Sequence, residues 1–404
     1  MIFRFREKLD PRRLSAGFVL IGALSMSLCT QGAVSHSAEF VHPGLLQTEQ
    51  DFTRIRAKLA NHEQPWQAGW QKLITNRHAS LAWNPSPAAV VYRGKDGQHP
   101  ENYNKLFNDA AAAYALAVRW RLSGNAEYAD KAVDILNQWS KMLTEIEGNS
   151  DRYLASGIYG YQFANAAEIM RNYSKWSPDD FQRFQRMMLT VFYPMNHSFL
   201  AHHNYAPTDH YWANWDLANM NSMLAIGVLT DRRDLYEEAV NYFKHGAGNG
   251  AIEHLVWKLY GNGLGQVQES GRDQGHTMLD IALLGSFCQM AWSQGDDLFG
   301  YQGNRVLQGA EYVATYNLGQ DVPFTPVANS SFEQPIISVV DRGDIRPIWE
   351  MLYNHYVVLK GLKAPNVAAF AHKVRAEGGG GDYGPNSGGF DQLGYGTLLY
   401  SLKQ

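Results

Sequence analysis

Most of the side chains that could do chemistry in this sequence lie between residues 266 and 276. The stretch reads QVQESGRDQGH, and it contains three amides, two carboxylates, Arg272 and His276. An apolar run with helical spacing follows at residues 278–287, and polar groups at the mouth of a buried helix are costly unless they have partners or a function. Arg272 and His276 would share one face of a helix. A fixed cation beside an imidazole can hold an anion and move its protons.

A second polar group lies between residues 202 and 216 (HHNYAPTDHYWANWD). Its histidines and acids raise the question of a metal site, but the sequence has neither the H-E-x-x-H pattern nor paired cysteines. We therefore predict no catalytic metal. Tyr211 and Trp215 flank Asn214 in this segment, and aromatic faces beside an amide suit the binding of sugar rings. These residues are candidate substrate contacts.

The residue types in these two segments are compatible with more than one class of protein. A serine hydrolase is disfavoured, because the sequence has no G-x-S-x-G motif and no strand pattern that would precede one. A glycoside hydrolase is a serious alternative, since Glu269, Asp273 and Asp216 could supply the pair of carboxylates that such an enzyme needs. A protein that binds a polysaccharide without cleaving it is the other alternative.

Helices must position these residues, because helical periodicity dominates from about residue 50 onward. The pattern predicts an all-α fold of sequential helical hairpins, either an α/α toroid or a solenoid, and the absence of a fixed repeat argues against the solenoid. Polar residues gather at the predicted helix starts, and they converge on one cleft if alternate helices begin at the same end of a ring. The best strand candidate is residues 336–340. The predicted helices are 107–122, 128–142, 155–173, 178–193, 209–229, 235–243, 276–292, 303–316, 346–359 and 365–374.

Composition and charge narrow the class of protein further. The chain has 404 residues, of which 45% are hydrophobic and 18% charged, as in a globular protein with a large core. Its net charge of −4 disfavours general binding of nucleic acid, so an anionic substrate would need a local basic patch. Residues 1–38 have the basic start, apolar middle and small-residue end of a signal peptide, and we expect residues 39–404 to form one catalytic domain that is periplasmic or secreted, without a membrane segment. The mature chain would hold only Cys288, hence no internal disulfide.

Three segments resemble the alginate-lyase-like polysaccharide lyases, most closely the group of glucuronan lyases and broad alginate lyases. They are residues 214–217 (NWDL), 268–276 (QESGRDQGH) and 384–391 (GPNSGGFD), and residues 42–46 (HPGLL) are similar to the start of these domains. The resemblance spans roughly residues 40 to 400. It implies an incomplete (α/α) toroid and β-elimination on a 1,4-linked polyuronate, with no cofactor. Glucuronan and mannuronate-rich alginate are both open as substrates.

The resemblance also implies roles for single residues. Asn214 matches the amide that neutralises the uronate carboxylate, with Gln268 as a second contributor, and Arg272 matches the cation beside that carboxylate. His276 or His203 matches the catalytic imidazole.

The family's tyrosine has no counterpart at the matching place. It follows the arginine by about two turns, where this chain has Met278, Leu279 and Asp280. The phenol would have to come from elsewhere, and we favour Tyr260 because it precedes Gln268 in the same loop. The other candidates are Tyr211, Tyr161 and Tyr316; Gln268, Trp215, Tyr211 and Tyr161 are the expected substrate-binding residues.

Overall fold

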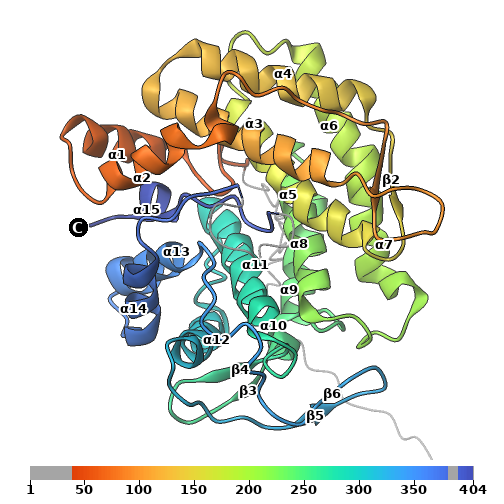
Figure 1. Cartoon of the computed structure of the whole chain (residues 1–404), viewed down its shortest axis with the longest axis vertical. Coiled ribbons are helices and arrows are strands. Elements are labelled where there is room, and N and C mark those ends of the chain that lie inside the picture. Colours follow the sequence, from red (N-terminus) through yellow and green to blue (C-terminus); the bar gives the residue numbers. More distant parts are fainter. Residues whose placement is uncertain (1–38, 381–389, 404) are drawn as a thin grey trace, which may run out of the picture. The chain divides into compact units, whose positions relative to one another are not determined.

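A computed structural model describes residues 39–380 and 390–403, and within them helices joined by loops dominate (Figure 1). The expected signal peptide and residues 384–389 of the GPNSGGFD segment lie outside the described residues. The helices are α1 (Glu49–Ala60), α2 (Trp66–Thr75), α3 (Asn104–Ser123), α4 (Ala126–Met142), α5 (Arg152–Met170), α6 (Pro178–Met187), α7 (Tyr193–His202), α8 (Ala213–Leu229), α9 (Arg233–His245), α10 (Ile252–Leu255), α11 (Gln274–Ser293), α12 (Tyr301–Asn317), α13 (Trp349–Tyr353), α14 (Pro365–Val374) and α15 (Gly396–Tyr400). Short 3-10 or π turns are η1 (Arg77–Ala79), η2 (Met188–Phe192), η3 (His203–Tyr205) and η4 (Asn354–Leu359).

Inner and outer helices alternate along the chain. The inner helices α3, α5, α8 and α11 contact one another in that order, and α5, α8 and α11 are buried on nearly every side. Helices α4, α9 and α12 each pack on the inner helix before them, and α4 and α9 bury only one face, as expected for amphipathic outer helices. This alternation forms an incomplete (α/α) toroid, which confirms the predicted fold class.

Small residues let the inner helices pack closely. A Cβ atom at Gly157 of α5 would lie 2.7 Å from the backbone of Ala218 in α8, and one at Gly160 would lie 2.1 Å from the Ser222 hydroxyl. Glycine therefore allows α5 and α8 to approach more closely than any larger residue would permit. In Figure 1, α8 and α11 run side by side through the middle of the described region.

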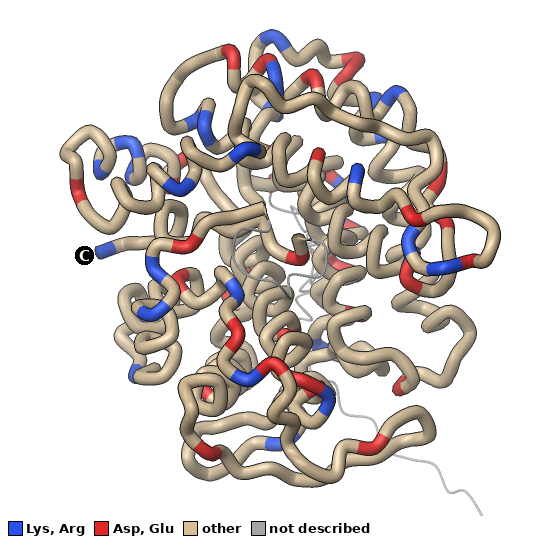
Figure 2. Tube along the Cα trace, viewed as in Figure 1, with Lys and Arg blue, Asp and Glu red and all other residues tan. Residues whose placement is uncertain are grey.

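Charge is scarce on these two central helices. Figure 2 shows Lys and Arg concentrated on other elements. Helix α8 carries Asp216 as its one charged residue, and α11 carries Asp280, with no Lys or Arg on either. A charge in such a buried position needs a partner or loses its charge, so each of these acids calls for an explanation.

In the described part of the chain, three two-stranded ribbons accompany the helices, which the sequence did not predict. β1 (Val90–Arg93) pairs in parallel with β2 (Glu145–Gly148), whereas β3 (Val256–Leu259) with β4 (Gly265–Val267) and β5 (Val327–Ala328) with β6 (Glu333–Gln334) are antiparallel. The predicted strand at residues 336–340 is wrong. That segment is an exposed loop whose backbone bonds Ser270 and Gln274, at the start of α11.

Candidate active site

A cleft of about 480 Å³ opens where α8 and α11 begin. Both helices direct their N-terminal ends, the positive ends of the helix dipoles, toward this space. Its walls come from β1, α5, α8 and α11, from the turn before α11, from the loop between β6 and α13, and from Asp391, which precedes α15. The lining residues are Arg93, Asp151, Leu154, Ile158, Asn214, Trp215, Arg272, Asp273, Gly275, His276, Leu279, Asp341, Arg346 and Asp391. Asn214, Arg272 and His276 from the two sequence motifs thus meet in one place.

His276 is oriented by Asp273. Asp273 is the N-cap of α11: one carboxylate oxygen accepts the backbone N–H of His276, and the other lies 2.7 Å from its Nδ1. Burial raises the pKa of Asp273, but the bonds from His276 and the charge of Arg272 outweigh that effect, and the pKa is lowered overall. The ionised carboxylate only accepts, so Nδ1 carries the hydrogen, and in the neutral imidazole the lone pair is then on Nε2. The His276 side chain is 40% exposed, which leaves Nε2 accessible.

Arg272 is fixed from two sides. Its Nη1 donates to Glu269 at 2.7 Å, and its guanidinium lies 4.8 Å from the ring centre of Trp212. The four-residue spacing would place Arg272 and His276 on one face of a helix that contained both, but α11 begins only at Gln274, so Arg272 precedes it. The side chain is 26% exposed and lines the cleft, so part of the guanidinium is open to a ligand.

Glu269 joins the two halves of the site. It is fully buried, and its second oxygen accepts the backbone N–H of Asn214 at 3.0 Å. One carboxylate therefore sets the position of Arg272, which precedes α11, and of Asn214, the second residue of α8. Trp215 lines the cleft beside Asn214, and its ring is stacked on Phe199.

Two cations of the cleft were not among the predicted site residues. Arg346 is the first residue of the predicted helix 346–359; it donates to Asp391 at 2.9 Å and to the Gly275 carbonyl. Arg93 lies at the end of β1. Its guanidinium lies 5.1 Å from the centre of the Tyr103 ring and donates to the Tyr159 hydroxyl at 3.3 Å. Among the residues that the structure describes, no ion pair involves Arg93.

Three other predicted residues lie outside the cleft lining. His203 is buried, and its Nε2 lies 3.1 Å from Asp216 and 3.0 Å from the Tyr242 hydroxyl. The Tyr211 hydroxyl accepts a hydrogen bond from Asn204. Gln268 is buried behind the start of α8, where its side-chain oxygen accepts the Ala213 N–H. These contacts position the segment that carries Asn214.

The tyrosine candidates also lie away from the cleft lining. The Tyr260 hydroxyl donates to Gln266 at 2.7 Å and contacts Thr325. Tyr161 is buried and donates to the backbone carbonyl of Asp391. Tyr316 is buried beneath Arg342. The cleft wall at the position two turns after Arg272 is Leu279, an apolar side chain.

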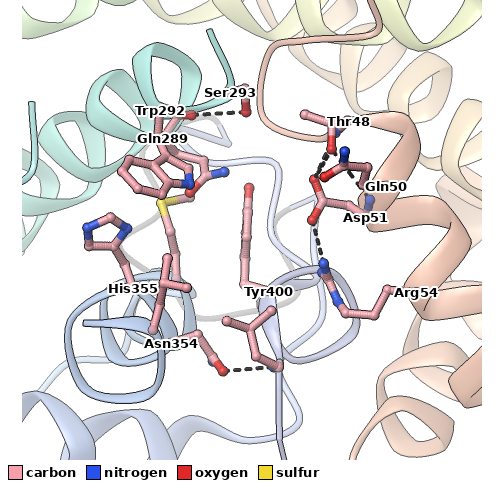
Figure 3. Close-up of a pocket in the computed structure, with 13 residues that line it drawn as sticks. Thr48, Gln50, Asp51, Arg54, Gln289, Trp292, Ser293, Asn354, His355 and Tyr400 are labelled. Carbon is pink, nitrogen blue, oxygen red and sulfur yellow. Dashed lines mark hydrogen bonds and ion pairs between the residues drawn. The ribbon is translucent and has the colours of Figure 1, made fainter. Parts of the chain in front are cut away.

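A second cavity lies at the opposite end of α11 (Figure 3). It has a volume of about 360 Å³, and Trp292 and Tyr400 are among its lining residues. Its arginine, Arg54, is bonded to Asp51 at 2.6 Å, as Figure 3 shows. Burial lowers the pKa of His355 to about 4, so that imidazole is neutral near pH 7. The start of α1 contributes Thr48 and Asp51 to this cavity, but its lining histidine is buried and neutral, unlike the exposed His276 of the first cleft.

Two further structural observations concern metals and membranes. Within residues 39–380 and 390–403, no group of three or more His, Cys, Asp or Glu side chains is placed to hold a metal ion. Nor does this part of the chain include a helix that is both long and apolar enough to cross a bilayer.

Comparison with known proteins places these features in context. The family model described as alginate lyase matches residues 58–323. An alginate lyase from Bacteroides ovatus is similar in structure at 14% identity, with a TM-score of 0.58, over 90% of this chain and 100% of the other. A histidine-to-alanine variant of alginate lyase A1-III, an enzyme from Sphingomonas species A1, gives 15% identity and a TM-score of 0.57 over 91% and 98%. The same variant with a bound tetrasaccharide has a TM-score of 0.53 at 15% identity, over 91% of this chain and 98% of the other. No curated protein matches the chain.

Proposed function

The chain belongs to the alginate lyase family, and we propose that it is a polysaccharide lyase that breaks 1,4-linked polyuronates by β-elimination. The observation that carries this proposal is the convergence of Asn214, Arg272 and the Asp273–His276 pair on one cleft. An exported enzyme would meet such polymers outside the cytoplasm, which agrees with the signal peptide proposed for residues 1–38.

The first task of the site is to make the C5 proton of the uronate acidic. Removing that proton places negative charge on the adjacent carboxylate group, and fixed donors that face it stabilise this charge. Arg272 offers the open part of its guanidinium, and Asn214 offers its amide. The N-terminal ends of α8 and α11 add positive potential at the same point.

The second task is proton transfer, and His276 is placed to perform it. In our scheme Nε2 takes the C5 proton while Asp273 stabilises the resulting imidazolium. The electrons of the C5–H bond form the C4–C5 double bond, the C4–O4 bond breaks, and O4 takes the proton back from His276. No water enters, and the products are a 4,5-unsaturated uronate end and a free O4 hydroxyl. This scheme uses no tyrosine and so replaces the role first expected of Tyr260.

A single proton carrier has a stereochemical consequence. In mannuronate and glucuronate, H5 and O4 lie on the same face of the sugar ring, so one group can reach both atoms. In guluronate, the C5 epimer of mannuronate, they lie on opposite faces and need two groups. We therefore propose polymannuronate and glucuronan as substrates in preference to polyguluronate. The choice between the first two depends on contacts with the C2 hydroxyl.

Arg93 fits a neighbouring sugar of the same polymer. Every uronate unit carries a carboxylate, so a chain in the cleft presents charges on both sides of the cleaved bond. Arg346 is committed to Asp391, whereas Arg93 bonds only the neutral Tyr159 hydroxyl among the side chains that the structure describes. We assign Arg93 to binding of an adjacent carboxylate.

The hydrolase alternative loses its carboxylate pair in this geometry. Glu269 is buried with both oxygens occupied by N–H groups, and Asp216 is buried against His203. Asp273 has a lowered pKa, which is the opposite of what a general acid needs.

The decisive experiment measures the ultraviolet absorbance of unsaturated uronate ends. The purified enzyme is incubated separately with polymannuronate, glucuronan and polyguluronate, and reducing ends are measured in parallel. We expect absorbance to rise with one or both of the first two polymers, in step with the new reducing ends. Reducing ends without absorbance would establish a hydrolase. Binding without either product would establish a carbohydrate-binding protein.

A further inference from the structure

The one acidic residue of α11, Asp280, lies behind the candidate active site. It is completely buried, one turn after His276 and two turns after the capping Asp273. Its carboxyl group meets the carboxyl group of Glu269. Within the described residues, no N–H or hydroxyl group donates a hydrogen bond to either oxygen of Asp280. By contrast, Asp216 on α8 accepts the Gly250 N–H and contacts His203.

Two buried carboxyl groups in contact cannot both be ionised. The partners decide which of them keeps the proton. Glu269 accepts N–H bonds from Asn214 and from the cationic Arg272, and both bonds favour its ionised form. Asp280 receives none. Burial, followed by the charge of Glu269, raises the pKa of Asp280 well above its ordinary value. A proton held on Asp280 makes this residue the donor and Glu269 the acceptor.

We propose that Asp280 is a positioning residue that stays protonated and donates its O–H to Glu269, and thereby fixes Arg272 and Asn214 for catalysis. This inference rests on the proposed lyase function. Glu269 makes a bond to each of these two cleft residues, so a third bond from Asp280 leaves its carboxylate no freedom to turn. Misplacement of catalytic groups by a fraction of an ångström lowers rates strongly.

Protonation also sets the charge that a substrate meets. Arg272 already faces the negative charges of Glu269 and Asp273. An ionised Asp280 would add another negative charge in the same buried cluster and weaken the attraction of Arg272 for a uronate carboxylate. A neutral donor supplies the hydrogen bond without that cost.

The first test compares Asp280→Asn with Asp280→Leu, two uncharged side chains of similar size. Asparagine can still donate to Glu269, whereas leucine cannot. We expect kcat/KM on the preferred polyuronate to stay within about 3-fold for Asp280→Asn and to fall about 10-fold or more for Asp280→Leu. A packing role would not be rescued selectively by the donor. Equal losses in the two variants, or no loss in either, would overturn the proposal.

The second test detects the proton directly and needs neither activity nor the leucine variant. Infrared spectra of the wild type and Asp280→Asn are recorded in ²H₂O at about pH 9, where Glu377, whose burial raises its pKa to about 7, is ionised. The difference spectrum should show the carbonyl stretch of one protonated carboxylic acid in the wild type. Its absence would refute the proposal even in an active lyase, and its presence in an enzyme without unsaturated product would refute only the proposed function.

Discussion

Replacing Arg272 tests the proposed reaction most directly. Arg272→Ala removes the guanidinium that we assign to the uronate carboxylate and leaves Glu269 without its cation. Both activity and stability should therefore change, but for different reasons. Arg272→Lys separates them, because lysine restores a charge near Glu269 without the planar fork that can bond two groups at once.

The magnitudes follow from the geometry. A hydrogen bond to a charged group contributes roughly 1.5–3 kcal/mol, so its loss in the transition state lowers kcat/KM by about 10- to 150-fold. Breaking a buried ion pair costs about 3–5 kcal/mol, and an exposed one about 1 kcal/mol or less. Arg272 is 26% exposed and Glu269 keeps the Asn214 N–H. We therefore expect Arg272→Ala to lower the free energy of unfolding by about 1–3 kcal/mol.

The assay combines initial rates of unsaturated-uronate formation with thermal unfolding. Arg272→Ala should lose about two orders of magnitude in kcat/KM and a few degrees in Tm. Arg272→Lys should keep a Tm near that of the wild type and still lose about 10-fold or more in kcat/KM. If Arg272→Ala remains folded and its kcat/KM stays within about 3-fold of the wild type, Arg272 is only the partner of Glu269 and the proposed carboxylate contact is wrong.

Four further outcomes are expected. His276→Ala should lower kcat by about 10²-fold or more while the polymer still binds, measured by turnover and by a binding isotherm; unchanged kcat would remove the proposed base. The lowered pKa of Asp273 stabilises the fold above the ordinary carboxyl pKa of about 4, and this contribution is lost as pH falls through the lower folded value, so Asp273→Asn should reduce Tm at pH 7 but progressively less on acidification. Arg93→Ala should raise KM by about 10-fold with kcat nearly unchanged, and the defect should shrink at high salt. Tyr260→Phe should keep kcat/KM within about 3-fold, because its hydroxyl bonds Gln266 rather than facing the cleft; a large loss would return a tyrosine to the mechanism.

Much of the helical framework was predictable because its signals are local. A helix repeats every 3.6 residues, so its apolar face and its ends are visible within one segment. The structure has α14 at Pro365–Val374, the predicted bounds, and α3 extends the predicted helix by only a few residues. The motif at residues 268–276 likewise located Arg272 and His276 correctly beside a shared cleft.

Local sequence patterns do not predict structure where the hydrogen-bond partners of a segment come from a distant part of the chain. The run of β-branched residues at 336–340 is typical of a strand, yet no strand in the described part of the chain pairs with it, and its backbone instead bonds the turn before α11. Asp273 takes the N-cap position of α11, so Arg272 lies outside the helix and its four-residue spacing from His276 is not a helical one.

The sequence by itself determined the fold class, the family and the residue types of the central motif, since each depends on residues within short windows. The tertiary structure decided which side chains share the cleft. Arg93 reaches it because β1 pairs with a strand more than fifty residues later. Glu269 and Asn214 meet across 55 residues, and Arg346 and Asp391 across 45. Such contacts are set by how whole helices pack, and packing depends on all facing side chains at once rather than on any local pattern.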